Sequence, residues 1–221
     1  MSDPARPVVI VIAAGPGVSG SLARRYAREG YDAGLVGVHE PVLQTLADEL
    51  TELGAGVHHV VADITDPAAA SPAIGGLAER FGRVDVLHFN PSAFRQKHPL
   101  TLTSAELLQD VGLGVGALLT ALQAVRPFMS AGGRVTATGS MAADKPWNEA
   151  ASLGVQKAGL RNLLHSIDAT LEPDGIRACS LTVRGTLGED GPFTPDRIAD
   201  ALWDAAHQDE SEWRTEVPYT G

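Results

Sequence analysis

Short apolar runs alternate along the chain with longer stretches of helical periodicity. The run at residues 7–13 is almost continuously apolar, as expected for a parallel strand covered on both faces. Between such runs, apolar residues recur every three or four positions, which is the spacing of one helix face. This order predicts a single-domain α/β protein with a Rossmann-type, doubly wound parallel sheet of about seven strands. The other expected strands are 32–38, 57–62, 84–89, 133–138, 176–183 and 213–218.

Capping residues mark the beginnings of several helices. Pro41 predicts a first helical turn, and Asp66 and Thr194, each followed by proline, predict N-caps. Thr103 and Glu106 form a capping box that opens a long helix to about residue 129. Alternate glycines at 112, 114 and 116 predict a bend or close backbone packing in that helix. Buried faces are expected at Leu43, Leu46, Leu50 and Leu53, and at Leu160, Leu163, Leu164, Ile167 and Leu171, and a helix is expected at 21–29.

Composition limits the class of protein. The 221 residues suit one domain spanning 1–221, and 44% apolar residues are enough for a core. A net charge of −10 argues against nucleic acid or an anionic membrane as a partner, and we see no apolar run of about 18 residues. The first seven residues lack a signal-peptide pattern, and the single Cys179 suits a reducing compartment and a buried thiol. We therefore expect a cytoplasmic protein.

A glycine-rich turn links the first strand to the first helix. Residues 15–20 match the pattern G-x-G-x-x-G in its required context of strand, turn and helix. Glycines there let the backbone approach a pyrophosphate at a helix N-terminus, which predicts a dinucleotide site. The alternative is a turn that only packs the helix on the strand. The expected contacts are Gly15, Gly17, Val18, Ser19 and Gly20.

Ser140, Leu153 and Lys157 have the spacing of an active-site segment. Leu153 follows Ser140 by thirteen residues and precedes Lys157 by four. The segment resembles the short-chain dehydrogenase/reductase family, in which a serine, a tyrosine and a lysine have this spacing. The resemblance implies catalytic roles for Ser140 and Lys157, and contact of Lys157 with the cofactor ribose; a helix-surface lysine is the alternative. The tyrosine, the family's proton donor and acceptor, is replaced by Leu153.

Further segments extend the resemblance over nearly the whole chain. Asp63, followed by Ile64, matches the aspartate that contacts the adenine, with a helix-capping acid as the alternative. Asn90 and Ser92 match the family's Asn-Asn-Ala-Gly segment, which lines the cofactor site; an Asn-Pro turn would use the same residues. The stretches 152–157, 182–185 and 213–216 resemble a branch that already lacks the tyrosine.

Other positions depart from the family pattern. Ala13 and Ser19 stand where the family has glycines, which predicts a tighter phosphate pocket. Gly112 replaces the asparagine of the family's proton path, and Glu189 replaces the threonine that grips the nicotinamide. Residues 185–192 form a shorter segment than the family's substrate lid, so we expect an open, wet site.

We find only weak substitutes for the missing proton donor. Ser152 is adjacent to position 153 but should point about 100° away from it on a helix. Asp144, Lys145 and Glu149 follow the fifth strand and are lesser candidates. No metal site is expected, because the histidines at 58, 59, 88 and 98 lack metal-ligand spacing.

The resemblance implies NAD or NADP as cofactor. Glu40 follows the second strand near the spacing of the acid that binds the ribose of NAD, which favours NAD; Pro41 behind it leaves a helix-capping role open. Family members often dimerise by pairing two long helices. Here the stretches 104–129 and 152–171 are apolar on more than one face, which predicts a homodimer or homotetramer.

Two functions remain open from the sequence. One is an NAD(P)-dependent short-chain oxidoreductase acting on a small carbonyl or alcohol through a degenerate active site. The other is a non-catalytic dinucleotide-binding, scaffold or sensor protein that keeps the fold.

Overall fold

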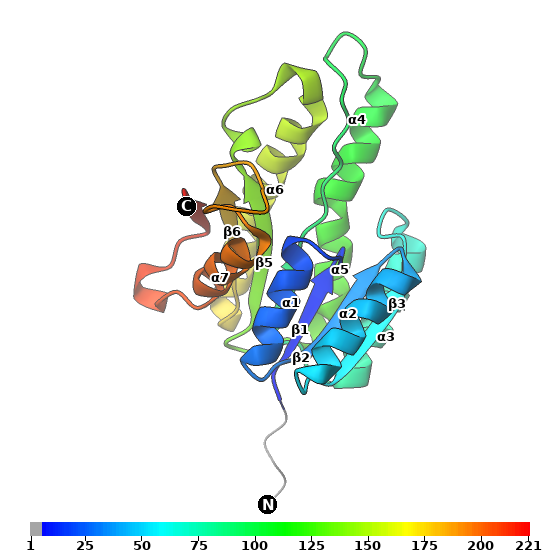
Figure 1. Ribbon diagram of the computed structural model, residues 1–221, viewed down its shortest axis with the longest axis vertical. Helices are drawn as coiled ribbons and strands as arrows, with labels where there is room; N and C mark the ends of the chain where they lie inside the picture. The colour runs from blue at the N-terminus through cyan, green and yellow to red at the C-terminus, as the bar shows by residue number, and fades with distance from the viewer. Residues whose placement is uncertain (1–5) are drawn as a thin grey trace, which may run out of the picture.

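Seven parallel strands form one sheet in the computed structural model, which describes residues 6–221 (Figure 1). The spatial order is β3-β2-β1-β4-β5-β6-β7, and the direction of winding reverses between β1 and β4. This confirms the predicted Rossmann-type sheet, whose ligand crevice is expected at that reversal. Residues 1–5, on which much of the signal-peptide expectation rests, lie outside the described part. The strands are β1 (Val8–Ile12), β2 (Asp32–Gly37), β3 (Val57–Val61), β4 (Val86–Phe89), β5 (Arg134–Ser140), β6 (Arg177–Val183) and β7 (Glu216–Tyr219).

Helices cover both faces of the sheet. On β1, Val8, Ile10 and Ile12 enter one apolar cluster, while Val9 and Val11 enter the other. The continuous apolar run at the start of the chain follows from this two-sided burial. One face carries α1 (Val18–Arg28), α2 (Glu40–Glu52) and α7 (Pro195–Ala206), and the other carries α3 (Pro67–Phe81), α5 (Ala117–Val125) and α6 (Ala151–Leu171). The remaining helix, α4 (Ser104–Val111), extends past the sheet (Figure 1).

The predicted caps are confirmed, and boundary predictions for the first helix, the second helix and the last strand are wrong. Asp66 accepts from the backbone of α3, Thr194 from that of α7, and Thr103 and Glu106 form the capping box. The first helix begins at Val18, three residues before the predicted start, because the glycine turn leads directly into it. Leu53 is 40% exposed rather than buried, because α2 ends before it and Gly54 turns the chain with φ +86°. The last strand begins at Glu216 rather than at 213, because a short helical turn at Glu210–Glu212 precedes it.

The three alternate glycines lie in a π-helical turn, Gly112–Gly116, between α4 and α5. A Cβ at Gly114 would approach the side chain of Gln156 to within 2.5 Å of Oε1. Gln156 in turn holds the backbone of Ala93, accepting from its N–H at 2.9 Å and donating to its carbonyl at 3.1 Å. The predicted close packing is therefore confirmed, and it fixes the segment after β4.

The helical run Ser104–Phe128 is 25 residues long with a mean hydropathy of 1.4, and by length and composition it could cross a membrane. In this fold its second half has a different place. Leu118, Ala121 and Val125 of α5 are fully buried in the core cluster that α5 forms with the sheet. A core helix of a folded domain meets the same criteria of length and hydropathy.

Candidate active site

The glycine turn is held by its own side chains. Ala13 has a left-handed backbone (φ +60°), where the family pattern has glycine. Ser19 Oγ donates to the Ala13 carbonyl at 3.0 Å and accepts from the Gly15 N–H at 3.1 Å. A Cβ at Gly20 would overlap the carbonyl oxygen of Gly15, so this glycine is required for packing. Ser19 and Gly20 therefore shape the turn from within.

Open space remains above the turn at two other glycines. A Cβ at Gly15 or Gly17 would meet no heavy atom within 4 Å. Gly17 is the N-cap of α1 and has no side-chain capping bond, so the first N–H groups of the helix face this space. Unpaired N–H groups and the helix dipole together attract an anion. The turn thus fits a pyrophosphate at its exposed rim.

A cavity of about 280 Å³ lies on one side of the turn, between the ends of β1, β2 and β3. Asp63 and Ile64 line it, as predicted, together with Gly15, Val38 and His39. The Asp63 carboxylate accepts from the Thr65 N–H at 2.9 Å and from its hydroxyl at 2.6 Å, and these bonds lower its pKa. The helix N-cap is Asp66, so the capping alternative for Asp63 is wrong.

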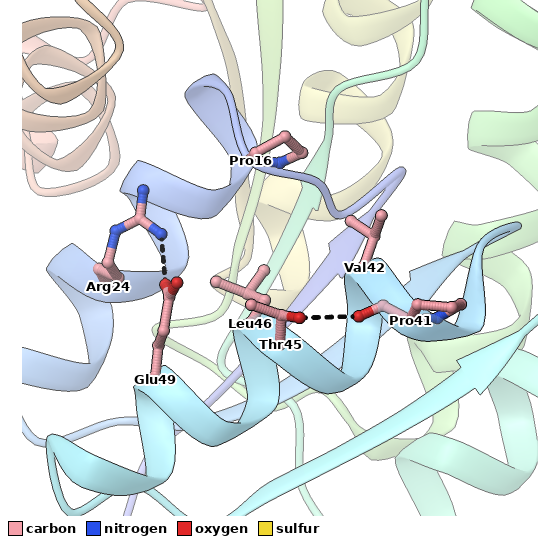
Figure 2. Close-up of a pocket in the computed structure, with 7 residues that line it drawn as sticks. All are labelled: Pro16, Arg24, Pro41, Val42, Thr45, Leu46 and Glu49. Carbon is pink, nitrogen blue, oxygen red and sulfur yellow. Dashed lines mark hydrogen bonds and ion pairs between the residues drawn. The ribbon is translucent and has the colours of Figure 1, made fainter.

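A groove between α1 and α2 adjoins this cavity (Figure 2). Pro16 and Val42 line both spaces. The one cation lining the groove, Arg24, is paired with Glu49 at 2.8 Å across the two helices (Figure 2). The charge next to the turn is therefore already neutralised.

A cavity of about 410 Å³ lies on the other side of the turn, at the carboxyl ends of β4, β5 and β6. It brings together most of the sequence-predicted site. The predicted residues that line it are Gly17, Val18, Asn90, Ser92, Ser140 and Lys157. Leu153 lines it too, so the side chain at the family's tyrosine position does face the cavity.

Lys157 is buried in the wall of this cavity. It is 6% exposed, and its Nζ donates to the Thr138 carbonyl at 2.9 Å. Burial lowers the pKa of Lys157 to about 8. The alternative of a helix-surface lysine is therefore wrong. Next to it, buried His88 hydrogen-bonds Thr136, and burial followed by the charge of Lys157 lowers the pKa of His88 to about 3, so this imidazole is neutral.

The lesser candidates for a proton donor lie outside the cavity. Asp144 is bound by both terminal nitrogens of Arg161, at 2.7 and 3.0 Å, which lowers its pKa. Glu149 accepts from Asn148. Ser152 faces away from the cavity, as expected, and donates to Asp110 at 2.6 Å. Lys157 is thus the one ionisable residue among those that line the cavity.

The short segment after β6 is fastened to the end of the sheet. The ring of Phe193 packs directly on Gly185, where a Cβ would overlap it. The rings of Tyr219 on β7 and Phe193 meet edge to face, with their centroids 5.7 Å apart. The Tyr219 hydroxyl donates to the Pro192 carbonyl at 2.5 Å. Glu189 is exposed and does not line the cavity.

Comparison with known proteins identifies the family. A sequence profile described as short chain dehydrogenase matches residues 7–187. This chain belongs to the short-chain dehydrogenase/reductase family. Oxidoreductase UcpA of Escherichia coli (strain K12) is 31% identical over 182 residues, covering 78% of this chain and 68% of the relative. Sulfoacetaldehyde reductase 2 of Chromohalobacter salexigens is 28% identical over 181 residues, covering 80% and 70%.

Solved structures of the short-chain dehydrogenase/reductase family share the fold. A short-chain dehydrogenase/reductase from Serratia marcescens superimposes with a TM-score of 0.86 at 22% identity, covering 98% of this chain and 97% of that one. A short chain dehydrogenase from Burkholderia cenocepacia J2315, solved in complex with NADP, gives 0.86 at 22% identity with the same coverage.

Phe94, Thr138 and Leu187 are among the cavity residues that were not expected from the sequence. Phe94 and Leu187 give the cavity wall apolar surface, although they are 63% and 53% exposed. Thr138 supplies the carbonyl that holds Lys157. Phe94 and Leu187 lie in irregular segments, where no periodicity predicts their orientation. Thr138 acts through its backbone carbonyl, and a backbone group cannot be recognised from the residue type.

Proposed function

We propose that this protein is an NAD(P)-dependent oxidoreductase that acts on a small carbonyl or alcohol through a degenerate active site. The observation that carries this proposal is the pair of cavities flanking the turn at 15–20, one with Asp63 and the other with Ser140 and Lys157. A dinucleotide extended across the turn would place one half in each cavity. A bound NAD(P)H would supply a hydride to the substrate carbon.

Ser140 and Lys157 would orient the substrate and the cofactor. The Ser140 hydroxyl accepts from the Ala142 N–H at 3.2 Å and keeps its own proton to donate to a carbonyl oxygen. Lys157 would hold the ribose and, below its pKa of about 8, carry the only ionisable proton of the cavity lining. Since a positioned general acid contributes roughly 10²–10⁴ in rate, loss of the tyrosine should leave reduction slow by about that factor.

We further propose a preference for NAD. Glu40, at the start of α2, places a carboxylate after β2, where a 2′-phosphate would add further negative charge. Arg24 in the adjoining groove is already paired with Glu49. Glu49→Gln should release Arg24 and strengthen NADPH binding more than NADH binding. Equal effects on both cofactors would refute this account of the preference.

A non-catalytic dinucleotide-binding or sensor role is the second candidate. Leu153 in the cavity favours it, because leucine has no proton to transfer. Quenching of tryptophan fluorescence by NADH and NADPH tests both proposals. Trp147 can report on the cavity, because its ring centroid lies 6.0 Å from that of the cavity residue Phe94. Binding with turnover of small ketones supports the oxidoreductase, and binding without turnover supports the sensor. Absence of binding contradicts the oxidoreductase and leaves a scaffold.

A further inference from the structure

Lys157 is a buried amine in a largely apolar wall. Its one hydrogen bond among those described goes to a neutral acceptor, the Thr138 carbonyl. The cavity around it is lined by apolar side chains from four segments: Phe94, Leu153, Val183 and Leu187. In the family pattern, position 153 would present a phenol to this amine. Here it presents a methyl-terminated side chain, so the amine faces space suited to an apolar molecule.

The ionisable side chains near Lys157 are bonded to other residues. His88 of β4 is neutral and bonded to Thr136. Arg161, one helical turn after Lys157 on α6, pairs with Asp144 and with Glu216 of β7. Burial is the cause that lowers the pKa of Lys157, and no carboxylate among the described residues counteracts it.

A lysine in this state is a nucleophile at ordinary pH. With a pKa of about 8, roughly half of the Lys157 side chains are neutral at pH 8. A solvated lysine, with a pKa of about 10.4, is less than 1% neutral at that pH. The neutral fraction is therefore about 100-fold larger at Lys157. Desolvation in an apolar pocket is one of the ways in which proteins activate lysine toward carbonyl groups.

We propose that Lys157 forms a reversible imine with aldehydes or unhindered ketones that carry an apolar group. The Nζ lone pair attacks the carbonyl carbon to form the C–N bond, and the C–O bond then breaks. The carbonyl oxygen leaves as water with the two hydrogens of the amine. Amine and carbonyl give imine and water, so the step needs neither oxidant nor reductant. This activity goes beyond the proposed hydride transfer and does not require a dinucleotide.

The sequence makes the test clean, because the chain has three lysines: Lys97, Lys145 and Lys157. The folded protein is incubated at pH 8 with benzaldehyde and cyanoborohydride, which reduces an imine to a stable amine, and the peptides are mapped by mass spectrometry. We expect labelling at Lys157 to be at least about 10-fold faster than at exposed Lys145, which allows for slower access to a buried group. Unfolding in guanidinium should remove the difference. The N-terminal amine is resolved as a separate peptide.

Two variants and one ligand complete the test. Lys157→Arg should abolish the selective label, while Lys145→Arg should leave it unchanged. Equal or slower labelling of Lys157 than of Lys145 in the folded wild type would overturn the proposal, whether or not Lys157→Arg folds. NADH is added in a parallel reaction. Selective labelling without NADH binding would refute only the proposed function, and NADH binding without selective labelling would refute only the imine.

Discussion

The hydroxyl of Ser19 lies 3.0 Å from the carbonyl oxygen of Ala13 and donates a hydrogen bond to it. Two departures from the family pattern are thus in contact. Ala13 occupies a backbone conformation that favours glycine, and Ser19 stabilises the turn that contains it. The same hydroxyl accepts from Gly15, which leaves that N–H unavailable to a phosphate. The tighter phosphate pocket stays a prediction, and this arrangement is the reason to expect it.

Ala13→Gly should stabilise the protein. A residue with a Cβ in the left-handed region costs roughly 1–2 kcal/mol, and the greater freedom of glycine in the unfolded chain returns part of that gain. We expect an increase of about 0.5–1 kcal/mol in the free energy of unfolding, measured in urea. Ala14→Gly is the control, since Ala14 is not among the described residues with positive φ, and it should be destabilising.

Gly17→Asp should abolish dinucleotide binding without unfolding the protein. A side chain at this position meets no protein atom within 4 Å, and aspartate is a favourable N-cap for α1. Its carboxylate would instead repel a pyrophosphate. Gly17→Asn has nearly the same shape without the charge, so the difference in affinity between the two variants, measured by fluorescence quenching, separates charge repulsion from steric block. Unchanged affinity in a folded Gly17→Asp variant would remove the phosphate site from the turn.

Leu153→Tyr alone should restore little ketone reduction. The phenol would enter the cavity beside Lys157 and Ser140, yet the proton path that an asparagine supports in the family would still be missing at Gly112. A Cβ at Gly112 meets no atom within 4 Å, so Gly112→Asn is sterically possible. We expect the double variant to exceed either single variant, as measured by NADH and NADPH oxidation with a panel of small ketones and quinones.

Two results would contradict this account of catalysis. Efficient turnover by the wild type would show that a proton donor other than tyrosine already serves the cavity. Full activity in Leu153→Tyr alone would show that Gly112 and Glu189 matter little. Ser140→Ala in the double variant is the control, and it should remove the regained activity.

Lys157→Met should stabilise the protein most at neutral pH. A lysine whose pKa falls to about 8 on folding disfavours the folded state below pH 8, and this penalty disappears as the pH rises toward its usual pKa of 10.5. After loss of the bond to Thr138, we expect a gain of about 1–2 kcal/mol at pH 7 that shrinks by pH 10. Urea titrations at both pH values test this, with Lys145→Met as the pH-insensitive control.

The oligomeric state remains a prediction, but the structure reduces the number of leucines that can form the interface. Leu122, Leu160 and Leu164, which belong to the two stretches expected to pair, are buried in the core cluster under the sheet. Leu108 and Leu119 remain outward, 70% and 40% exposed.

Light scattering at micromolar concentration should give a dimer or tetramer mass. Leu108→Glu with Leu119→Glu should shift it to a monomer, because two charges would replace apolar contacts. Leu53→Glu, directly after α2 in the opposite layer, should leave the mass unchanged. A monomeric wild type would contradict the prediction.

The fold was predictable because local and global signals agree. The continuous apolar run of β1 matches its burial on both faces. Asp66 and Thr103 cap the helices that were predicted to begin after them. Boundaries were less predictable where glycines govern them. The start of α1 at Val18 depends on how the turn passes into the helix, and the exposure of Leu53 depends on the reversal at Gly54.

The candidate site was predictable in its spacing but not in its environment. The spacing in the sequence groups Ser140, Leu153 and Lys157 as one active-site segment, and in the structure all three line one cavity. It does not show that the Lys157 amine is bonded to a backbone carbonyl, or that Asp144 is bound by Arg161. These facts depend on contacts between segments far apart in the chain, and they decide which groups are free to react.

The π-helical turn at Gly112–Gly116 bears on how the length of this chain can change. A π turn holds one residue more than the α-helical hydrogen-bond pattern accommodates, and it arises where a residue is inserted while the flanking helices keep their register. Removing Gly112, where an added Cβ would meet no heavy atom within 4 Å, should therefore yield a continuous helix with α4 and α5 still in place. This turn is the point in the helical layer at which a single-residue deletion should be tolerated.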